Sequence, residues 1–214
     1  MDPQANDIDS YLEFAKAKGM EIKYVIDTHV QADHISGGRH LAQLAGADYC
    51  LHESADVAFD FTSLKGDQKL DLGNVSIRVL HTPGHTPESI CLLVTDKTRG
   101  PEPWFLLTGD TLFVGAVGRP DLPGNASESA AQLYKTLQEK VLTLPETLEI
   151  YPAHFSGSLC GAGLSGKPMS TLAFEKRWNP SLTLDREAFI EKMTSTFPPK
   201  PADMEAVLRA NRHA

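Results

Sequence analysis

One short segment constrains this chain more than any other feature of its sequence. The segment Thr28–His34 follows the apolar run Tyr24–Ile26 and brings two histidines and a carboxylate together within six residues. Imidazole and carboxylate groups are common metal ligands in proteins. A segment of this kind at the end of a buried strand predicts a loop that binds a metal ion.

Later segments repeat the arrangement of an apolar run followed by a polar turn. They are Thr82–Thr86 after Val75–Leu80, Thr108–Asp110 after Trp104–Leu107, and Tyr151–His154 after Leu148–Ile150. Because all these runs end in a possible ligand, we expect one site along one edge of a sheet. The candidate residues from these segments are His29, Asp33, His34, His85, Asp110 and His154. The remaining histidines lack this context, and we expect them to be packed or solvated.

Length and composition predict a single domain over residues 1–214. A chain of 214 residues with 41% hydrophobic and 22% charged residues can bury a large core. No apolar run approaches the roughly 20 residues that span a bilayer, and Met1–Gln4 lacks the features of a secretion signal. We therefore expect a cytoplasmic protein with no membrane partner.

Charge and cysteine content exclude two further classes. The net charge is −8, and no basic run of the kind found in nucleic-acid-binding proteins is present. The cysteines are Cys50, Cys91 and Cys160, an odd number without close spacing. This pattern argues against a disulfide framework and against a cysteine-based zinc site.

The hydrophobic pattern predicts an α/β fold with a sheet-rich core and helices outside it. Expected helices cover residues 7–18, 38–45, 127–142, 170–178 and 185–193. Expected strands cover residues 22–26, 47–51, 75–80, 90–94 and 104–107, the last two forming a hairpin. After residue 193 we expect a polar tail.

The loop Thr28–His34 resembles the His-x-His-x-Asp-His loop of the metallo-β-lactamase superfamily, and His85, Asp110 and His154 match the later ligands of that superfamily in order. The resemblance covers essentially the whole chain and implies an αββα sandwich with the metal at the sheet edge. Within the superfamily, several segments resemble the persulfide dioxygenases more than the glyoxalase II hydrolases. These segments are Gly109–Phe113, Gly118–Asp121, Asn179–Thr183 and Pro198–Pro201.

Gln31 stands where the superfamily has its second histidine. An amide is a weak ligand beside imidazole, so a two-metal hydrolytic site loses one ligand. The resemblance to persulfide dioxygenases implies one Fe(II) per chain, held by His29, His85 and Asp110. Two imidazoles and one carboxylate form a set that suits non-haem iron and leaves positions open.

Other residues near the metal receive roles from the same resemblance. We expect Asp33, His34 and His154 to be catalytic, as hydrogen-bonding groups that orient a ligand or a metal-bound water. The alternative is that they bind a second metal ion, with Asp110 as the bridge.

Arg119 and Cys160 are the candidate substrate-binding residues. The guanidinium of Arg119 suits an anionic part of the substrate, although an ion pair with Asp121 is an equal alternative. Cys160 lies in a loop of small residues close to His154 in sequence. A thiol beside a metal pocket can carry sulfur or form a mixed disulfide, and the alternative is an inert buried thiol.

These observations predict an Fe(II) dioxygenase that oxidises a low-molecular-weight thiol persulfide with O₂ to sulfite and the free thiol. The alternatives are a zinc-dependent hydrolase of thioesters or lactones, against which Gln31 counts, and a non-catalytic metal- or sulfur-binding protein. A rhodanese-type sulfurtransferase is a possible sulfur donor, and we expect a homo-oligomer. The family usually has two strands before the part that matches Met1–Pro3, so we expect either a late start or a sheet edge shielded by a partner.

Overall fold

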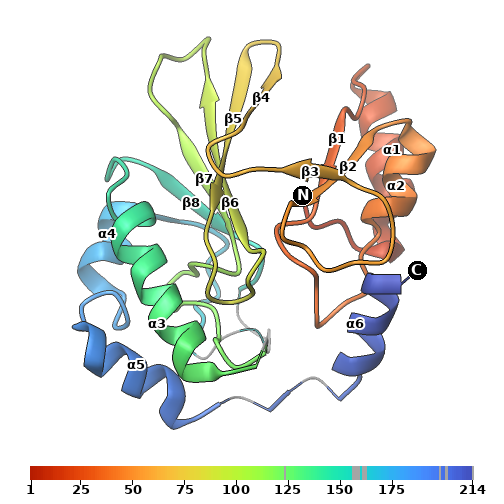
Figure 1. Ribbon diagram of the computed structural model, residues 1–214. Helices are drawn as coiled ribbons and strands as arrows, with labels where there is room; N and C mark the ends of the chain where they lie inside the picture. The colour runs from red at the N-terminus through yellow and green to blue at the C-terminus, as the bar shows by residue number, and fades with distance from the viewer. Residues whose placement is uncertain (123, 156–159, 161–162, 198, 201, 214) are drawn as a thin grey trace. The chain divides into compact units, whose positions relative to one another are not determined.

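The computed structural model describes residues 1–213 apart from residues 123, 156–159, 161–162, 198 and 201. The described residues fall into two compact units, Met1–Leu64 with Lys200–Ala214, and Lys65–Pro199 (Figure 1). Each unit contains a sheet of its own. The single domain expected from the sequence stays a prediction.

The first unit is built on a parallel sheet with the strand order β1-β2-β3. Its helices and strands are α1 (Ile8–Ala17), β1 (Tyr24–Ile26), α2 (Gly38–Ala45), β2 (Asp48–His52), β3 (Thr62–Leu64) and α6 (Met204–His213), with a 3₁₀ turn at Ala5–Asp7. Ile8 of α1, Val25 of β1 and Leu41 of α2 meet in its core. Gly46 ends α2 in the left-handed conformation (φ 64°), which explains why this helix stops where the sequence predicted.

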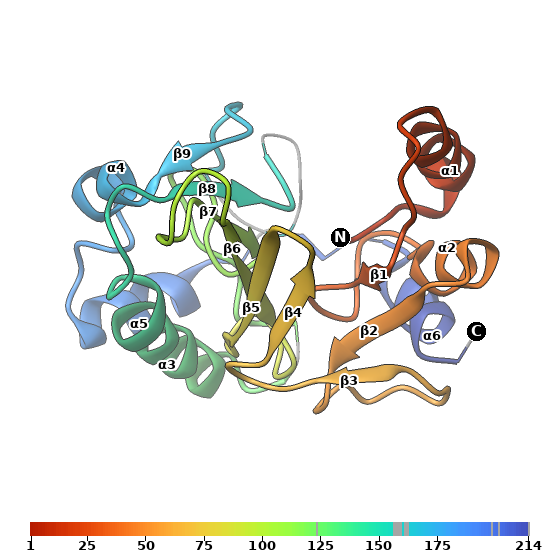
Figure 2. The ribbon, with the colours of Figure 1, turned by 90° about the horizontal axis from the view of Figure 1, so that it is seen from above.

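The second unit is built on a mixed sheet with the strand order β4-β5-β6-β7-β8-β9, which Figure 2 shows along its edge. Its elements are β4 (Lys69–Leu72), β5 (Val75–His81), β6 (Ile90–Asp96), β7 (Phe105–Gly109), α3 (Ala126–Thr136), a π-helical segment (Leu137–Val141), β8 (Glu149–Pro152), β9 (Ser170–Thr171), α4 (Leu172–Trp178) and α5 (Arg186–Ser195). The predicted hairpin is confirmed, since Leu92 of β6 lies opposite Leu107 of β7. Helices α3 and α5 lie side by side, and Leu133 and Phe189 from them enter the main core.

The directions of the strands determine where the predicted ligands of the second unit lie. Strands β5, β6 and β7 alternate in direction, and β8 runs parallel to β7. Strands β5, β7 and β8 therefore point the same way, and their carboxyl ends share one edge of the sheet. The loops that leave these ends carry His85, Asp110 and His154.

The expectation that all four apolar runs line one edge of a single sheet is wrong for the first run. Strand β1, which precedes His29, belongs to the sheet of the first unit. An apolar run followed by a polar turn indicates a buried strand, but it carries no information about which sheet the strand joins.

The expected polar tail is also wrong for residues 204–213, which form α6. Met204, Val207 and Leu208 recur at helical spacing, and the side chain of Val207 is buried. The prolines that precede the helix in sequence concealed this pattern. No helix among the described residues has both the length and the apolar character needed to cross a membrane.

Candidate metal centre

The loop after β5 fixes the orientation of His85. Gly84 lies so close to α3 that a Cβ atom there would meet the Leu133 Cα at 2.5 Å. The Nδ1 atom of His85 lies 2.8 Å from the backbone carbonyl oxygen of Arg119. Since a carbonyl oxygen only accepts hydrogen bonds, Nδ1 is the donor. The other ring nitrogen, Nε2, is then the atom that can hold a metal ion.

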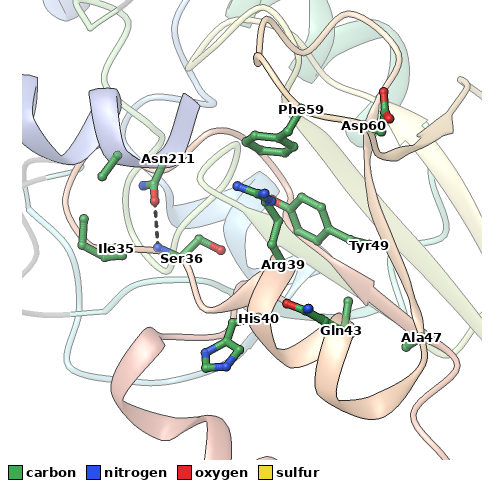
Figure 3. Close-up of a pocket in the computed structure, with 12 residues that line it drawn as sticks. Ile35, Ser36, Arg39, His40, Gln43, Ala47, Tyr49, Phe59, Asp60 and Asn211 are labelled. Atoms are coloured by element: carbon green, nitrogen blue, oxygen red, sulfur yellow. Dashed lines mark hydrogen bonds between the residues drawn. The ribbon is translucent and has the colours of Figure 1, made fainter. Parts of the chain in front are cut away.

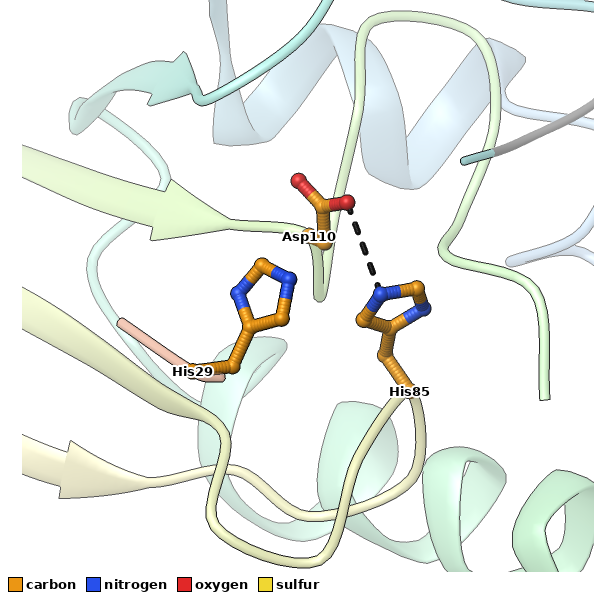
Figure 4. A group of neighbouring side chains, drawn as sticks. All are labelled: His29, His85 and Asp110. Atoms are coloured by element: carbon orange, nitrogen blue, oxygen red, sulfur yellow. Dashed lines mark ion pairs between the residues drawn. The ribbon is translucent and has the colours of Figure 1, made fainter. Parts of the chain in front are cut away.

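Asp110 follows β7 and faces His85. The carboxylate is buried, and its Oδ2 atom lies 3.5 Å from His85 Nε2 (Figure 4). A hydrogen bond of 3.0 Å between the Thr82 and Thr111 hydroxyls ties the two loops together. A ring nitrogen and a carboxylate oxygen that face each other at this distance suit a cation between them.

His154 and Cys160 extend this group of side chains. The Nδ1 atom of His154 donates to Asp110 Oδ1 over 2.8 Å. The ligand atoms of Asp110, His154 and Cys160 all lie within 4.8 Å of one another. Cys160 is buried against Phe113. The second unit therefore offers imidazole, carboxylate and thiol groups within the span of one metal centre.

The first unit holds His29 by a chain of hydrogen bonds. The Thr28 hydroxyl donates to the Asp2 carboxylate (Oδ2, 3.0 Å) and lies 3.1 Å from His29 Nδ1. When Asp2 is ionised it can only accept, so the hydroxyl proton points to Asp2 and the Thr28 oxygen accepts from His29 Nδ1–H. His29, like His85, is thus left with Nε2 for a metal ion.

Gln31 is also held by Asp2. Its side-chain amide nitrogen donates to Asp2 Oδ1 over 2.9 Å, and the Thr28 backbone N–H donates to the same oxygen over 2.7 Å. The Gln31 side chain is buried. Gln31, which stands where the superfamily has its second histidine, therefore donates a hydrogen bond from its amide nitrogen to a carboxylate.

Asp2 itself lies in an unusual electrostatic environment. Burial, together with the neighbouring carboxylate of Asp27, raises the pKa of Asp2 to about 7. Burial also raises the pKa of Asp27, which accepts hydrogen bonds from the hydroxyls of Ser36 and Tyr49. Asp2, which is partly buried, and Asp27, which is buried, are thus neighbouring carboxyl groups with raised pKa values beside the loop Thr28–His34, called the histidine loop below.

Asp33 and His34, the other candidates of this loop, pair with each other. The Nδ1 atom of His34 lies 3.0 Å from Asp33 Oδ1, and both side chains are partly buried. Their catalytic role stays a prediction.

Arg119 makes the ion pair that the sequence left as the alternative to substrate binding. Its Nε and Nη2 atoms donate to the two carboxylate oxygens of Asp121, each over 2.7 Å, and Nη1 donates to the Pro199 carbonyl oxygen over 3.2 Å. Both side chains are buried. The contact with substrate stays a prediction.

Sequence reasoning found the candidate ligands but missed the groups that hold them. Asp2 and Asn211 had no predicted role, although both bond to the histidine loop, and Thr28 was named only as part of that loop. A hydroxyl residue directly before a histidine was the available signal for Thr28. The Asn211 contact joins residues 180 positions apart and leaves no pattern in the sequence.

Comparison with known proteins identifies the superfamily of the chain. The family described as "Metallo-beta-lactamase superfamily" matches residues 1–154. The persulfide dioxygenase ETHE1 of Mus musculus is 30% identical over 200 residues, which are 93% of this chain and 72% of that protein. A hydroxyacylglutathione hydrolase of Nitrosococcus oceani is 31% identical, over 89% of this chain and 78% of the hydrolase.

Solved structures agree with this placement. A metallo-beta-lactamase from Staphylococcus aureus superposes with a TM-score of 0.92 at 33% identity, over 99% of this chain and 64% of that chain. This chain therefore spans less than two thirds of the S. aureus protein. ETHE1 from Myxococcus xanthus superposes with a TM-score of 0.84 at 31% identity, over 99% of this chain and 85% of that chain. The predicted metallo-β-lactamase fold is confirmed, and the chain belongs to the metallo-beta-lactamase superfamily and, within it, to the persulfide dioxygenase family.

Proposed function

We propose that this protein is a mononuclear Fe(II) persulfide dioxygenase. The reaction is R–S–SH + O₂ + H₂O → R–SH + H₂SO₃, in which the terminal sulfur is oxidised, O₂ is reduced, and the thiol leaves. The proposed ligands are His29, His85 and Asp110. Bound iron would supply adjacent open positions for the persulfide sulfur and for O₂.

The hydrogen bonding of the Gln31 side chain is the main support for this proposal. A hydrolase with two metal ions uses a histidine at this position, and here the amide nitrogen donates to Asp2 instead. The loop then lacks an imidazole two residues after His29. The substitution takes one ligand from the first site of a two-metal centre and leaves His29, His85 and Asp110 in place, which favours a one-metal oxygenase over a two-metal hydrolase.

The protein's own groups have separate tasks in this proposal. The Thr28 hydroxyl and the Arg119 carbonyl oxygen orient the rings of His29 and His85. His154 donates to Asp110 and so keeps one carboxylate oxygen directed away from the metal. Because the Cys160 thiol lies within 4.8 Å of ligand atoms of Asp110 and His154, we place it beside the bound persulfide.

Metal analysis and oxygen uptake test the proposal directly. Protein purified without O₂ and loaded with Fe(II) should hold about one iron per chain, as expected for two imidazoles and one carboxylate. It should consume O₂ with at least one of glutathione persulfide, coenzyme A persulfide and inorganic polysulfide, and not with the corresponding thiols. His85→Ala and Asp110→Ala should lose both iron and activity, and the matched control His213→Ala, an exposed histidine, should keep both.

The second candidate is a zinc hydrolase of thioesters, favoured by the similarity to the hydroxyacylglutathione hydrolase. Two zinc ions per chain, thioester hydrolysis and flat oxygen traces with persulfides would establish it and overturn the dioxygenase. The variant Gln31→Ala tests the proposed ligand set further. Its iron content should equal that of wild type, because Gln31 is not a proposed ligand.

A further inference from the structure

The side chain of Asn211, on α6, bonds to the backbone of the histidine loop. Its amide nitrogen donates to the carbonyl oxygens of Gln31 and His34, both over 2.9 Å. Its amide oxygen accepts from the Ser36 backbone N–H over 3.0 Å, as Figure 3 shows. One planar amide thus uses two donors and one acceptor on a single stretch of backbone.

These contacts determine the orientation of the amide. With oxygen and nitrogen exchanged, the NH₂ group would face the Ser36 N–H, and the oxygen would face two carbonyl oxygens. Only the observed orientation satisfies all three backbone groups. Aspartate at this position would lose both donors, and leucine would lose the donors and the acceptor.

The loop needs an external partner because it forms no regular helix or strand. Residues 27–35 lie between β1 and α2, outside the helices and strands of the first unit. On one side, Asp2 holds the loop at Thr28 and Gln31. Asn211 holds it from α6 at the backbone of Gln31 and His34. His29 lies in the part of the backbone between these attachments.

We propose that Asn211 is a positioning residue for the metal centre. By fixing the backbone of the histidine loop, it sets where His29 presents its Nε2 atom and where the pair Asp33–His34 lies. This inference rests on the proposed function, because it assumes that His29 is a metal ligand.

Asn211→Asp is the sharpest variant. It keeps the shape and the acceptor for the Ser36 N–H, but it turns two donors into acceptors that face carbonyl oxygens at 2.9 Å. Asn211→Leu removes the acceptor as well. Asn74→Asp is the matched control, because it makes the same chemical change at an exposed position in the turn between β4 and β5.

Hydrogen–deuterium exchange in the metal-free protein tests the attachment itself. Asn211→Asp should raise exchange in the peptide covering residues 28–36 by at least roughly tenfold, because two hydrogen bonds to the backbone are lost. Asn211→Leu should additionally expose the Ser36 amide. Unchanged exchange in both variants would overturn the proposal.

Metal affinity tests the positioning role. Titration with Fe(II) without O₂, and with Co(II), whose visible absorption reports its ligands, should show binding at least roughly tenfold weaker in Asn211→Asp, with an altered Co(II) spectrum. Circular dichroism should show both variants folded at the assay temperature. Faster exchange with unchanged metal affinity and spectrum would overturn the positioning role.

Failure of the proposed function and failure of the positioning role give different results. If wild-type protein binds neither metal, the proposed function fails, while the exchange experiment still decides whether Asn211 holds the loop. If wild-type protein binds iron and Asn211→Asp binds it equally well, the positioning role alone fails. A fall in kcat with little change in KM would agree with a displaced metal centre rather than with a lost substrate contact.

Discussion

At the scale of single residues, the neighbours of the candidate ligands matter as much as the ligands. Oxygen atoms of Thr28 and Arg119 accept from the Nδ1 atoms of His29 and His85. Both rings are therefore prepared to bind through Nε2 before a metal arrives. The carboxyl group of Asp2 supports one of these contacts and also carries an unusual charge equilibrium.

Asp2 predicts a pH dependence of stability. Its pKa is about 7 in the folded protein, against an ordinary 3.8. Between these pH values the folded protein keeps a proton that the unfolded chain has released. The contribution of this group is therefore full below about pH 4 and is lost as the pH rises to about 7.

Asp2→Asn should remove this titration. The free energy of unfolding of wild type should fall, relative to the variant, by roughly 1 kcal/mol per pH unit between about pH 4 and about pH 7. Urea unfolding at several pH values measures the difference, with the exposed Asp9→Asn as control. Parallel profiles of wild type and Asp2→Asn would show that Asp2 titrates normally.

Because Arg119 pairs with a buried carboxylate, its replacement should lower the stability of the protein, whether or not Arg119 also contacts substrate. Arg119→Ala leaves the buried carboxylate of Asp121 without its guanidinium partner, at a cost of roughly 3–5 kcal/mol. The double variant Arg119→Ala, Asp121→Ala should recover part of this loss. Chemical denaturation measures both. If Arg119→Ala is as stable as wild type but its KM for persulfide rises, Arg119 serves recognition and not the ion pair.

At the scale of elements, the loop after Asp110 passes so close to Asp110 and His85 that a side chain has no room at Gly118. A Cβ atom at Gly118 would collide with the Asp110 carbonyl oxygen and would approach the Cβ atom of His85 to 3.1 Å. The loops after β5 and β7 are therefore packed against each other through this glycine.

Gly118→Ala should displace Asp110 from His85. We expect a stability loss of about 1–3 kcal/mol from the forced movement and an iron affinity at least roughly tenfold lower. Gly100→Ala is the control, because a Cβ atom there meets nothing within 4 Å. Thermal unfolding and iron titration measure the two effects. An unchanged iron affinity would mean that the loop yields without moving Asp110.

The elements that the sequence predicted well have strong local signals. Helix α2 was predicted with its observed bounds because Gly46 ends it, and β6 and β7 were predicted because their cores are continuous apolar runs. The short strands β3 and β4 were missed. Both are short and mostly exposed, so they form through pairing with a neighbouring strand rather than through a long hydrophobic pattern.

The candidate site divides in the same way. His85, Asp110 and His154 were found because each follows an apolar run, and the structure shows that these runs are strands whose carboxyl ends share one sheet edge. Asn211 was not found, because its partners are backbone carbonyl groups, which every residue has. Side chains that bond to distant backbone atoms can be recognised only from the structure.

At the scale of the whole molecule, metal binding should appear as thermal stabilisation. Free Fe(II) at about a hundred times its dissociation constant stabilises the native state by about 2.7 kcal/mol, or roughly 5–10 °C in Tm for a chain of this size. Differential scanning fluorimetry without O₂ measures the shift. His85→Ala should show none. An equal shift in wild type and His85→Ala would place the iron at another site.

The distance in sequence between Asn211 and Gln31 has a consequence for biosynthesis. Residue 211 is translated 180 residues after residue 31, which takes roughly 10–40 seconds at ordinary elongation rates. During that interval the nascent chain contains His29 and His34 without the amide that fixes their backbone. Under the role proposed for Asn211, the histidine loop therefore takes its final backbone position only after α6 has been synthesised.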